Sequence, residues 1–309
     1  MVIVFDGDSV RNLIILSLVS LAALVVIVLV LSVAIPAALF SGPALFEKSI
    51  AVIPLKGEIF SSSDGYSRNY TAEELVKVID EASNDPAIGV IFLDIDSPGG
   101  GVVATKQIVA KIREVDKPVI AYIGDVGASG GYYVAAAADE IIADEDSLTG
   151  SIGVISMVYS MVELLDNLGV EVTTVTAGKN KDIGSPFSEL TEGQRKMLQE
   201  IVDQAMEGFK GDIIEFRGDK LDMAVFDELT DGRILSGRQA WKAGLIDGLG
   251  TKEYAFERAA ELGGIEGEPI FEIYGKGELT IFDIFTQAGS SFGNGISSRM
   301  LPSNEGLKS

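Results

Sequence analysis

The sequence predicts a mixed α/β protein with parallel strands and flanking helices, preceded by one N-terminal transmembrane helix. Two observations predict this class. Short runs of β-branched and apolar residues alternate with segments of helical periodicity along most of the chain, which is typical of buried parallel strands covered by helices. Ahead of these segments, no charged residue occurs between Leu13 and Ile35.

The uncharged stretch 13–35 is long enough to cross a bilayer, because a helix rises ~1.5 Å per residue and the hydrocarbon core is ~30 Å thick. The apolar cores of secretory signals are shorter, roughly 7–15 residues, so a membrane anchor is favoured. Small residues around Ala34 and Ala37 leave a long, cleaved signal peptide as the alternative. The nearest basic residues, Arg11 and Lys48, barely determine the orientation by the positive-inside rule.

After the anchor, strands and helices are expected in alternation. The β-branched runs that predict strands are residues 50–55, 88–95, 118–123 and 170–175. The segments that predict helices are residues 71–83, 102–115, 132–138 and 191 to about 216. The first of these helices opens with a capping-box pattern, Thr71-Ala-Glu-Glu74.

Composition divides the chain into four parts. A short tail, residues 1–12, precedes the anchor, residues 13–35. Residues 50–275 are expected to form the α/β domain. Residues 276–309 are rich in glycine and serine, which predicts a C-terminal tail.

The composition excludes several kinds of chemistry. The chain of 309 residues has no histidine and no cysteine, so it holds no Ser-His-Asp or Cys-His triad, no thiol nucleophile and no disulfide. The same absence disfavours a zinc site, and we expect no metal or organic cofactor. The formal net charge of −22 argues against binding to nucleic acid, which needs a basic surface.

Ser129 is the candidate nucleophile, because it lies among small residues in Gly127-Ala-Ser-Gly-Gly-Tyr-Tyr133. A substrate backbone can approach such a segment closely. Without histidine, the proton of Ser129 must pass to a lysine or a carboxylate, which points to a Ser-Lys dyad. Local sequence explains the serine equally well as the N-cap of the alanine-rich helix that follows.

Two further segments carry potential chemistry. Asp96-Ser-Pro-Gly-Gly-Gly101 follows the second strand, and its glycine N–H groups could converge on a developing oxyanion. A glycine-rich turn of this kind could equally bind a phosphate or simply reverse the chain. Lys179 and Lys181 follow the strand expected at 170–175, where a solvated surface loop is the ordinary alternative to a catalytic base.

Taken together, these segments resemble the signal peptide peptidase A family, membrane-bound serine proteases with the ClpP/crotonase fold. The matching segments occur in the family's order and are Asp96–Gly101, Ala128–Tyr133, Leu148–Val154, Lys181–Pro186 and Asp231–Ala240. They extend over most of the chain after the anchor. The chain contains one set of these motifs, so it resembles the short, single-repeat form of the family.

The resemblance implies a role for each matching residue. Ser129 would be the nucleophile and Lys181 the general base. The N–H groups of Gly100 and Gly130 would form the oxyanion hole, and the hydroxyl of Ser151 would orient the lysine.

Local chemistry leaves two of these roles open. Lys179 competes with Lys181 for the role of base, although Lys181 occupies the family's Lys-Asp position. Three consecutive glycines leave the register of the first oxyanion donor open, so Gly99 or Gly101 could take the place of Gly100.

The resemblance also implies a ring of protomers in which Ser129 of one subunit meets Lys181 of the next. A lysine in water is protonated at neutral pH and cannot accept a proton, so this hypothesis requires Lys181 to be buried on assembly. Asp182 is expected to point away from the amine, toward another cation, because a nearby carboxylate favours the protonated lysine.

As function, the resemblance implies degradation of remnant signal peptides and other hydrophobic, extended peptides. The protein would cross the cell membrane once, with its catalytic domain on the extracytoplasmic side. Its partners would be peptide substrates, membrane lipid and further copies of the chain. The alternatives are a stomatin-partner-type membrane protease with a dedicated protein substrate and a non-catalytic membrane scaffold of the same fold. The anchor and the Ser-Lys pair disfavour a crotonase-type acyl-CoA enzyme.

Overall fold

The computed structural model describes residues 48–61 and 71–275, together with Leu21 and Leu24. The predicted tails, residues 1–12 and 276–309, lie outside the described residues, as does the predicted anchor apart from those two leucines. Within the described part of the chain, no helix combines the length and the apolar character needed to cross a membrane.

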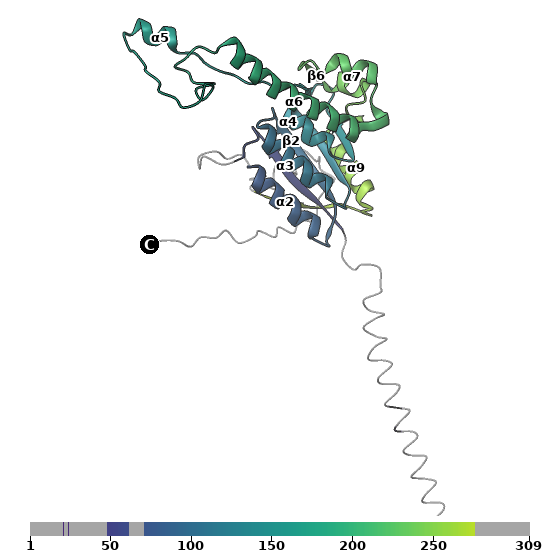
Figure 1. Ribbon diagram of the computed structural model, residues 1–309. Coiled ribbons are helices and arrows are strands. Elements are labelled where there is room, and N and C mark those ends of the chain that lie inside the picture. Colours follow the sequence, from purple (N-terminus) through teal and green to yellow (C-terminus); the bar gives the residue numbers. More distant parts are fainter. Residues whose placement is uncertain (1–20, 22–23, 25–47, 62–70, 276–309) are drawn as a thin grey trace, which may run out of the picture. The chain divides into compact units, whose positions relative to one another are not determined.

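The described chain alternates strands and helices (Figure 1). The strands are β1 (Ser49–Lys56), β2 (Ile88–Ser97), β3 (Val119–Ala128), β4 (Glu140–Ala143), β5 (Leu148–Gly150), β6 (Ile234–Ser236), β7 (Gly248–Leu249) and β8 (Ile270–Ile273). The α-helices are α2 (Ala72–Asn84), α3 (Val102–Arg113), α4 (Gly130–Ala136), α5 (Val162–Asn167), α6 (Glu192–Arg217), α7 (Met223–Leu229), α8 (Gly237–Lys242) and α9 (Lys252–Gly263), and one 3₁₀ turn, η1, covers Gly218–Lys220.

The strands form one sheet in the order β6-β5-β3-β2-β1-β8, and β4 pairs with both β3 and β7. Every pair is parallel except β5 with β6. The central strand β3 changes partner along its length, because Ile120–Ile123 pair with β4 and Val126–Ala128 pair with β5. The predicted mixed α/β fold with a parallel sheet and flanking helices is confirmed.

Helices cover both faces of the sheet, and the strand side chains alternate between them. Ile91 and Leu93 of β2 belong to the larger apolar cluster, which also contains the buried residues of α2, α3 and α4. Val90 and Phe92 point to the opposite face and pack with Ala255 and other residues of α9. Figure 1 shows α2, α3 and α4 on one side of the sheet and α9 on the other. Burial on both faces explains why these strands are almost wholly apolar in sequence.

The helix starts follow the predicted local chemistry. Thr71 accepts the Glu74 N–H (3.2 Å), and the Glu74 carboxylate accepts the Thr71 N–H (3.1 Å), so the predicted capping box is confirmed. Thr191 and Gln194 make the same reciprocal pair at the start of α6. Such side-chain bonds satisfy N–H groups that have no partner within the helix.

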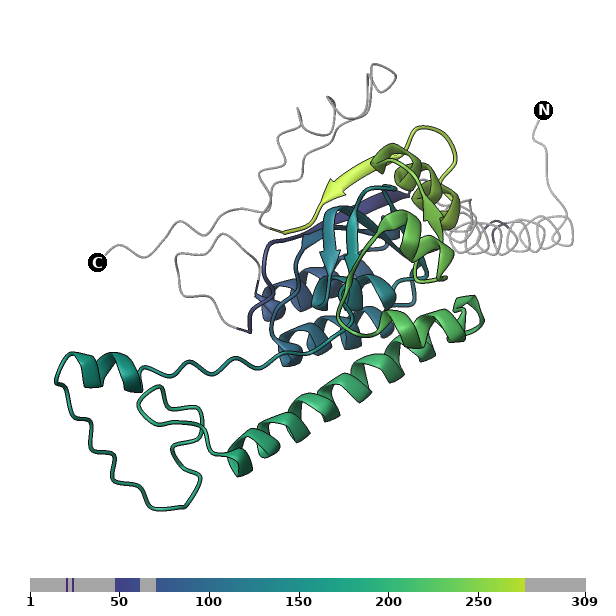
Figure 2. The ribbon, with the colours of Figure 1, turned by 90° about the horizontal axis from the view of Figure 1, so that it is seen from above.

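The prediction of a strand at 170–175 is wrong. Its alternating β-branched residues favour a strand locally, but the segment pairs with no other strand and Val175 is 93% exposed. It belongs to a long segment between β5 and α6, residues 153–191, here called the arm (Figure 2). Every residue of the arm is exposed or half-buried, and no strand among the described residues pairs with the backbone of 170–175.

The C-terminal end of α6 is fixed by a buried ion pair. Arg217, whose side chain is 1% exposed, donates to both carboxylate oxygens of Asp247 at 2.8 and 3.0 Å. The carboxylate also accepts the Ile141 N–H (2.8 Å) and contacts Lys220 Nζ at 2.7 Å. Burial alone would raise the pKa of Asp247, but the bonds and charge of Arg217 and then Lys220 outweigh it, and the pKa is lowered.

Replacing Arg217 by Met should lower the free energy of unfolding by roughly 3 kcal/mol or more, because it leaves a mostly buried carboxylate without its main partner. The matched control is Lys220→Met, expected to cost below about 1 kcal/mol because that lysine is 50% exposed. Because the folded-state pKa of Asp247 is lowered, the difference between wild type and Arg217→Met should be complete at neutral pH. It should shrink as the pH falls through that pKa, below the ordinary 3.8. Urea denaturation of both variants at several pH values tests this, and equal losses for the two variants would contradict it.

Candidate active site

Ser129 lies in a sharp turn between β3 and α4. Its φ of 52° and ψ of −120° fall in a region that glycine favours and other residues rarely adopt. The Ser129 N–H donates to the Gly150 carbonyl (2.8 Å), and the Ser129 carbonyl accepts the Tyr133 N–H (2.9 Å). A strained residue held from both sides is typical of functional sites. The hydroxyl makes no capping bond to α4, so the structure does not support the N-cap alternative.

The start of α4 packs backbone to backbone against the glycine turn that precedes α3. A Cβ atom added to Gly130 would lie 3.2 Å from the Gly100 nitrogen and 2.6 Å from Thr105 Oγ1. A Cβ atom on Gly131 would lie 2.5 Å from the Ser97 carbonyl oxygen. Side chains leave no room for such approaches, so the glycines let the two turns meet. The backbone amides at Gly100 and Gly130 are therefore brought together beside the serine.

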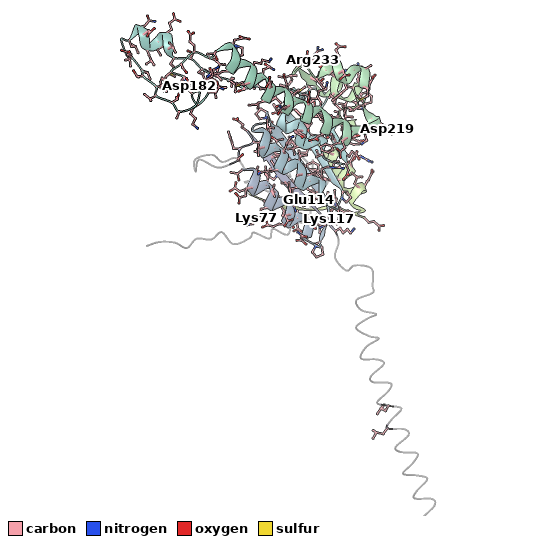
Figure 3. The ribbon with its side chains drawn as sticks, viewed as in Figure 1. Lys77, Glu114, Lys117, Asp182, Asp219 and Arg233 are labelled. Atoms are coloured by element: carbon pink, nitrogen blue, oxygen red, sulfur yellow. The ribbon has the colours of Figure 1, made fainter. Side chains whose placement is uncertain are left out.

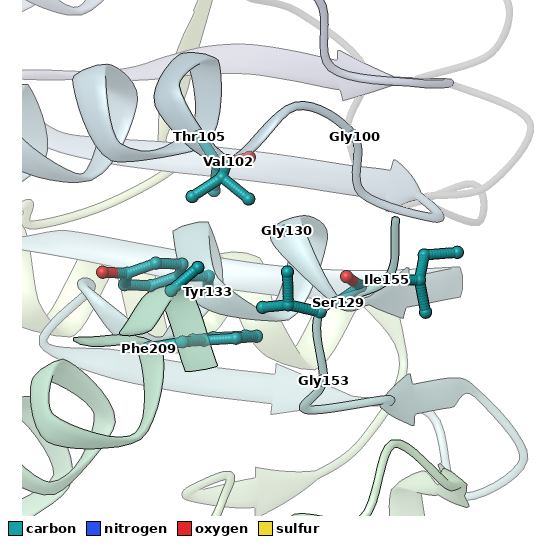
Figure 4. A pocket seen from close by; sticks show the side chains of 11 residues that line it. Gly100, Val102, Thr105, Ser129, Gly130, Tyr133, Gly153, Ile155 and Phe209 are labelled. Atoms are coloured by element: carbon teal, nitrogen blue, oxygen red, sulfur yellow. The ribbon is translucent and has the colours of Figure 1, made fainter. Parts of the chain in front are cut away.

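Hydrogen bonds distinguish the three glycines of the turn before α3. The Gly99 N–H donates to Ser97 Oγ (3.1 Å), and the Gly101 N–H donates to the Ile59 carbonyl (2.9 Å). The Gly100 N–H takes part in neither bond, and Gly100 lines the pocket beside the serine (Figure 4). An oxyanion hole requires donors that are not committed elsewhere. Of the three possible registers, the geometry therefore favours Gly100.

The pocket next to Ser129 is mainly apolar. Its lining residues are Gly100, Val102, Thr105, Ser129, Gly130, Tyr133, Gly153, Val154, Ile155, Ala205 and Phe209 (Figure 4). The rings of Tyr133 and Phe209 stack with centroids 4.4 Å apart. Burial raises the pKa of the Tyr133 hydroxyl, as does its hydrogen bond to Asp212, so this phenol stays neutral at physiological pH. The lining suits an apolar side chain of a ligand.

Sequence reasoning missed the walls of this pocket. Tyr133 lies four residues after Ser129 in the same motif, and this proximity in sequence could have indicated that it lines the pocket. Ala205 and Phe209 come from α6, and helical periodicity marks Phe209 only as an apolar-face residue. Their position beside the serine depends on packing between distant parts of the chain.

Ser151 directly follows Gly150, whose carbonyl accepts the Ser129 N–H. Its φ is 50°, and within the described residues it shares a positive φ only with Ser129 among the non-glycine residues. The Ser151 N–H donates to the Arg233 carbonyl (2.9 Å), and its hydroxyl donates to the Gly232 carbonyl (3.4 Å). Ser129 and Ser151 are thus linked through Gly150.

The candidate lysines lie away from the pocket. Lys179 and Lys181 are both exposed on the arm, and neither lines the pocket. Figure 3 shows the neighbouring Asp182 on the arm, beyond the first turn of α6. The Asp182 carboxylate accepts a hydrogen bond from Gln194 Nε2 (3.2 Å), so its observed partner is an amide and not the expected cation. A single chain therefore does not bring the predicted serine and lysine together.

Charged side chains in the described part of the chain form no metal site. No group of three or more His, Cys, Asp or Glu residues among them is arranged to hold an ion. The buried Asp94 carboxylate instead contacts two lysines, Lys56 (3.0 Å) and Lys252 (2.8 Å). This cluster lies on the α9 face of the sheet and ties α9 to β1 and β2.

Comparisons with known proteins agree on one family. Residues 111–266 match the model of Peptidase family S49. The chain is 32% identical over 256 residues to "Putative protease MJ0651" of Methanocaldococcus jannaschii, covering 81% of this chain and 82% of that protein. It is 34% identical over 217 residues to "Putative signal peptide peptidase SppA" of Enterococcus faecium, covering 68% of this chain and 62% of that protein. A solved structure of a mutant of the 1510-N membrane-bound stomatin-specific protease matches with a TM-score of 0.45 and 18% identity, covering 70% of this chain and 86% of that one.

Replacing Gly100 by Ala should lower the reactivity of Ser129 toward a fluorophosphonate probe by roughly 100-fold, the cost of losing one oxyanion donor. The new Cβ would lie 2.1 Å from the Ile59 carbonyl oxygen, so the backbone must shift. In the control Gly101→Ala, the atom nearest to the added Cβ is 3.7 Å away, so the backbone need not shift and the labelling rate should stay close to that of wild type. Labelling of Gly100→Ala at the wild-type rate, with folding confirmed by circular dichroism, would contradict this geometry.

Proposed function

The chain belongs to peptidase family S49 and is a serine-type peptidase, and we propose that it is a membrane-anchored Ser-Lys endopeptidase that degrades remnant signal peptides and other hydrophobic, extended peptides. The matches confirm the resemblance to signal peptide peptidase A. One observation carries the proposal. The strained Ser129 lines an apolar pocket together with Gly100 and Gly130, whose backbone amides are packed against each other.

The proposed reaction is acyl transfer. Ser129 Oγ attacks the peptide carbonyl while Lys181 accepts its proton, and the N–H groups of Gly100 and Gly130 stabilise the oxyanion. Lys181 then gives the proton to the leaving amine, and water hydrolyses the acyl-enzyme. Ser151 orients the lysine from its position beside the nucleophile turn. These steps use only groups of the chain itself and water.

Assembly would complete the site, in a ring where Lys181 of one protomer reaches Ser129 of the next. The arm that carries Lys181 exposes many apolar side chains, which supports its burial against a neighbour. Its exposed apolar side chains include Ile155, Met157, Tyr159, Leu164, Leu168 and Val175. The same contact would remove Lys181 from water and so favour the neutral amine that general-base catalysis needs.

The pocket and the predicted anchor support hydrophobic peptides as substrates. An apolar pocket beside the nucleophile suits an apolar side chain next to the scissile bond, and an anchor at residues 13–35 would hold the domain near membrane-derived peptides. We place the protein in the cell membrane as a single-pass protein with an extracytoplasmic catalytic domain. Cleavage of one dedicated membrane protein, with no turnover of varied hydrophobic peptides, would favour the stomatin-partner type of protease instead.

Lys181→Arg should abolish peptide cleavage and Ser129 labelling, because a guanidinium does not release its proton in the accessible pH range. Lys179→Ala should retain both activities. The measurement is fluorophosphonate labelling and peptide hydrolysis by the full chain in detergent, with Ser129→Ala as the unlabelled reference.

The pH profile adds an independent readout. The chain has no histidine, so cleavage should rise with pH along one limb, without a step near the usual histidine value of ~6.5. An active Lys181→Arg with an inactive Lys179→Ala would assign the base to the other lysine. Absence of any Ser129-dependent labelling would favour a scaffold.

Mixing Ser129→Ala with Lys181→Ala should restore activity, although each variant alone is inactive. In a head-to-tail ring with equal, random mixing, about a quarter of the junctions unite an intact serine with an intact lysine. Coexpression with two different affinity tags, tandem purification and peptide hydrolysis test this. Co-purified rings no more active than the single variants would reject a site shared between subunits and leave the Ser-Lys assignment in place.

A further inference from the structure

We propose that Ser97 is a positioning residue of the oxyanion hole. Its buried hydroxyl holds the Pro98–Gly99 peptide, and the backbone N–H of Ile59 holds the Gly99–Gly100 peptide that follows, so that the Gly100 N–H faces the nucleophile turn. This inference rests on the proposed function, since it concerns the donor that would stabilise the oxyanion formed at Ser129.

The Ser97 hydroxyl fixes the first peptide of the glycine turn. Ser97 is completely buried at the end of β2, and its Oγ accepts the Gly99 N–H at 3.1 Å. Gly99 has a φ of +100°, and a Cβ atom there would lie 2.5 Å from the Gly130 nitrogen. No side chain at Gly99 restrains its backbone, so hydrogen bonds must select its conformation.

The Ile59 backbone fixes the next peptide. The Ile59 N–H donates to the Gly99 carbonyl (2.8 Å), and the Ile59 carbonyl accepts the Gly101 N–H (2.9 Å). The chain contains no cis peptide bond among its described residues, so the Gly99 carbonyl and the Gly100 N–H point in opposite directions. A carbonyl held on the Ile59 side therefore turns the Gly100 N–H to the other side, where Gly130 lies.

Loss of the Ser97 hydroxyl would leave the buried Gly99 N–H without its acceptor. A glycine peptide can rotate to satisfy such a group, and rotation of this turn would move the Gly100 N–H away from the oxyanion. The effect should be confined to states that place the oxygen of a tetrahedral carbon in the oxyanion hole, which are the transition state of acylation and the adduct of an aldehyde. Ser97 also pairs with Gly127 in the sheet. If its role were purely structural, loss of the hydroxyl would lower the affinity for every ligand by the same factor.

The test compares two ligands of one sequence, a peptide aldehyde and the corresponding peptide amide, on the full chain in detergent. The aldehyde forms a reversible hemiacetal, in which Ser129 Oγ bonds to the aldehyde carbon and the proton moves to the former carbonyl oxygen. The amide binds without this bond. In Ser97→Ala, aldehyde affinity and kcat should each fall by roughly 10-fold or more, while amide affinity and KM stay within about two-fold of wild type.

Two further variants keep the test decisive. Ser97→Cys keeps the shape of the side chain, with a slightly larger and weaker acceptor atom, and should show the same selective loss if Ser97→Ala fails to fold. Thr149→Val is the matched control. It removes another completely buried hydroxyl near the site, one that donates to the Gly127 carbonyl (2.7 Å), and should leave the ratio of aldehyde to amide affinity unchanged.

The outcomes separate the inference from the proposed function. Equal loss of aldehyde and amide affinity in Ser97→Ala and Ser97→Cys, or no loss of either, would overturn the positioning role while wild type still forms the hemiacetal. A wild-type protein that binds the amide but forms no adduct at Ser129 would overturn the proposed function, and this inference with it.

Discussion

The close contact between two glycine turns is the constraint on which the site depends. The turn before α3 and the start of α4 meet with backbone atoms, because Gly99, Gly130 and Gly131 leave no side chain between them. This contact fixes Ser129 relative to the amide of the neighbouring turn. It also helps to hold the unfavourable backbone of the serine, since the strain at one residue persists only where its surroundings determine it.

The three long strands β1, β2 and β3 were predicted because their information is local, whereas the shorter strands β4 to β8 were not predicted. Strands buried on both faces are apolar along their whole length, and the capping box at Thr71 identifies a helix start from four residues. The segment 170–175 has the same local signal but forms no strand. A strand also needs a partner for its backbone, and the sequence of the segment does not contain that information.

The candidate site shows the same difference between residues that a short segment identifies and residues whose place depends on tertiary packing. Ser129 and the glycines were identifiable because their chemistry and conformation are properties of short segments. The pocket wall at Phe209 was not, because α6 reaches the serine only through tertiary packing. Lys181 is predicted as the base by motif alone, and in one chain it is exposed and lies outside the pocket. Sequence order does not say whether two residues meet within one chain or between two.

Under the proposed function, one chain holds most of the catalytic apparatus in place before assembly. The nucleophile turn and the amide of Gly100 are fixed by hydrogen bonds within the chain, so association has only to deliver the lysine. The same event must also remove that lysine from water, because an exposed amine stays protonated and cannot act as a base. Placement and desolvation of Lys181 then become one step. A free protomer, with a formed oxyanion hole but a solvated lysine, would lack the general base and remain inactive.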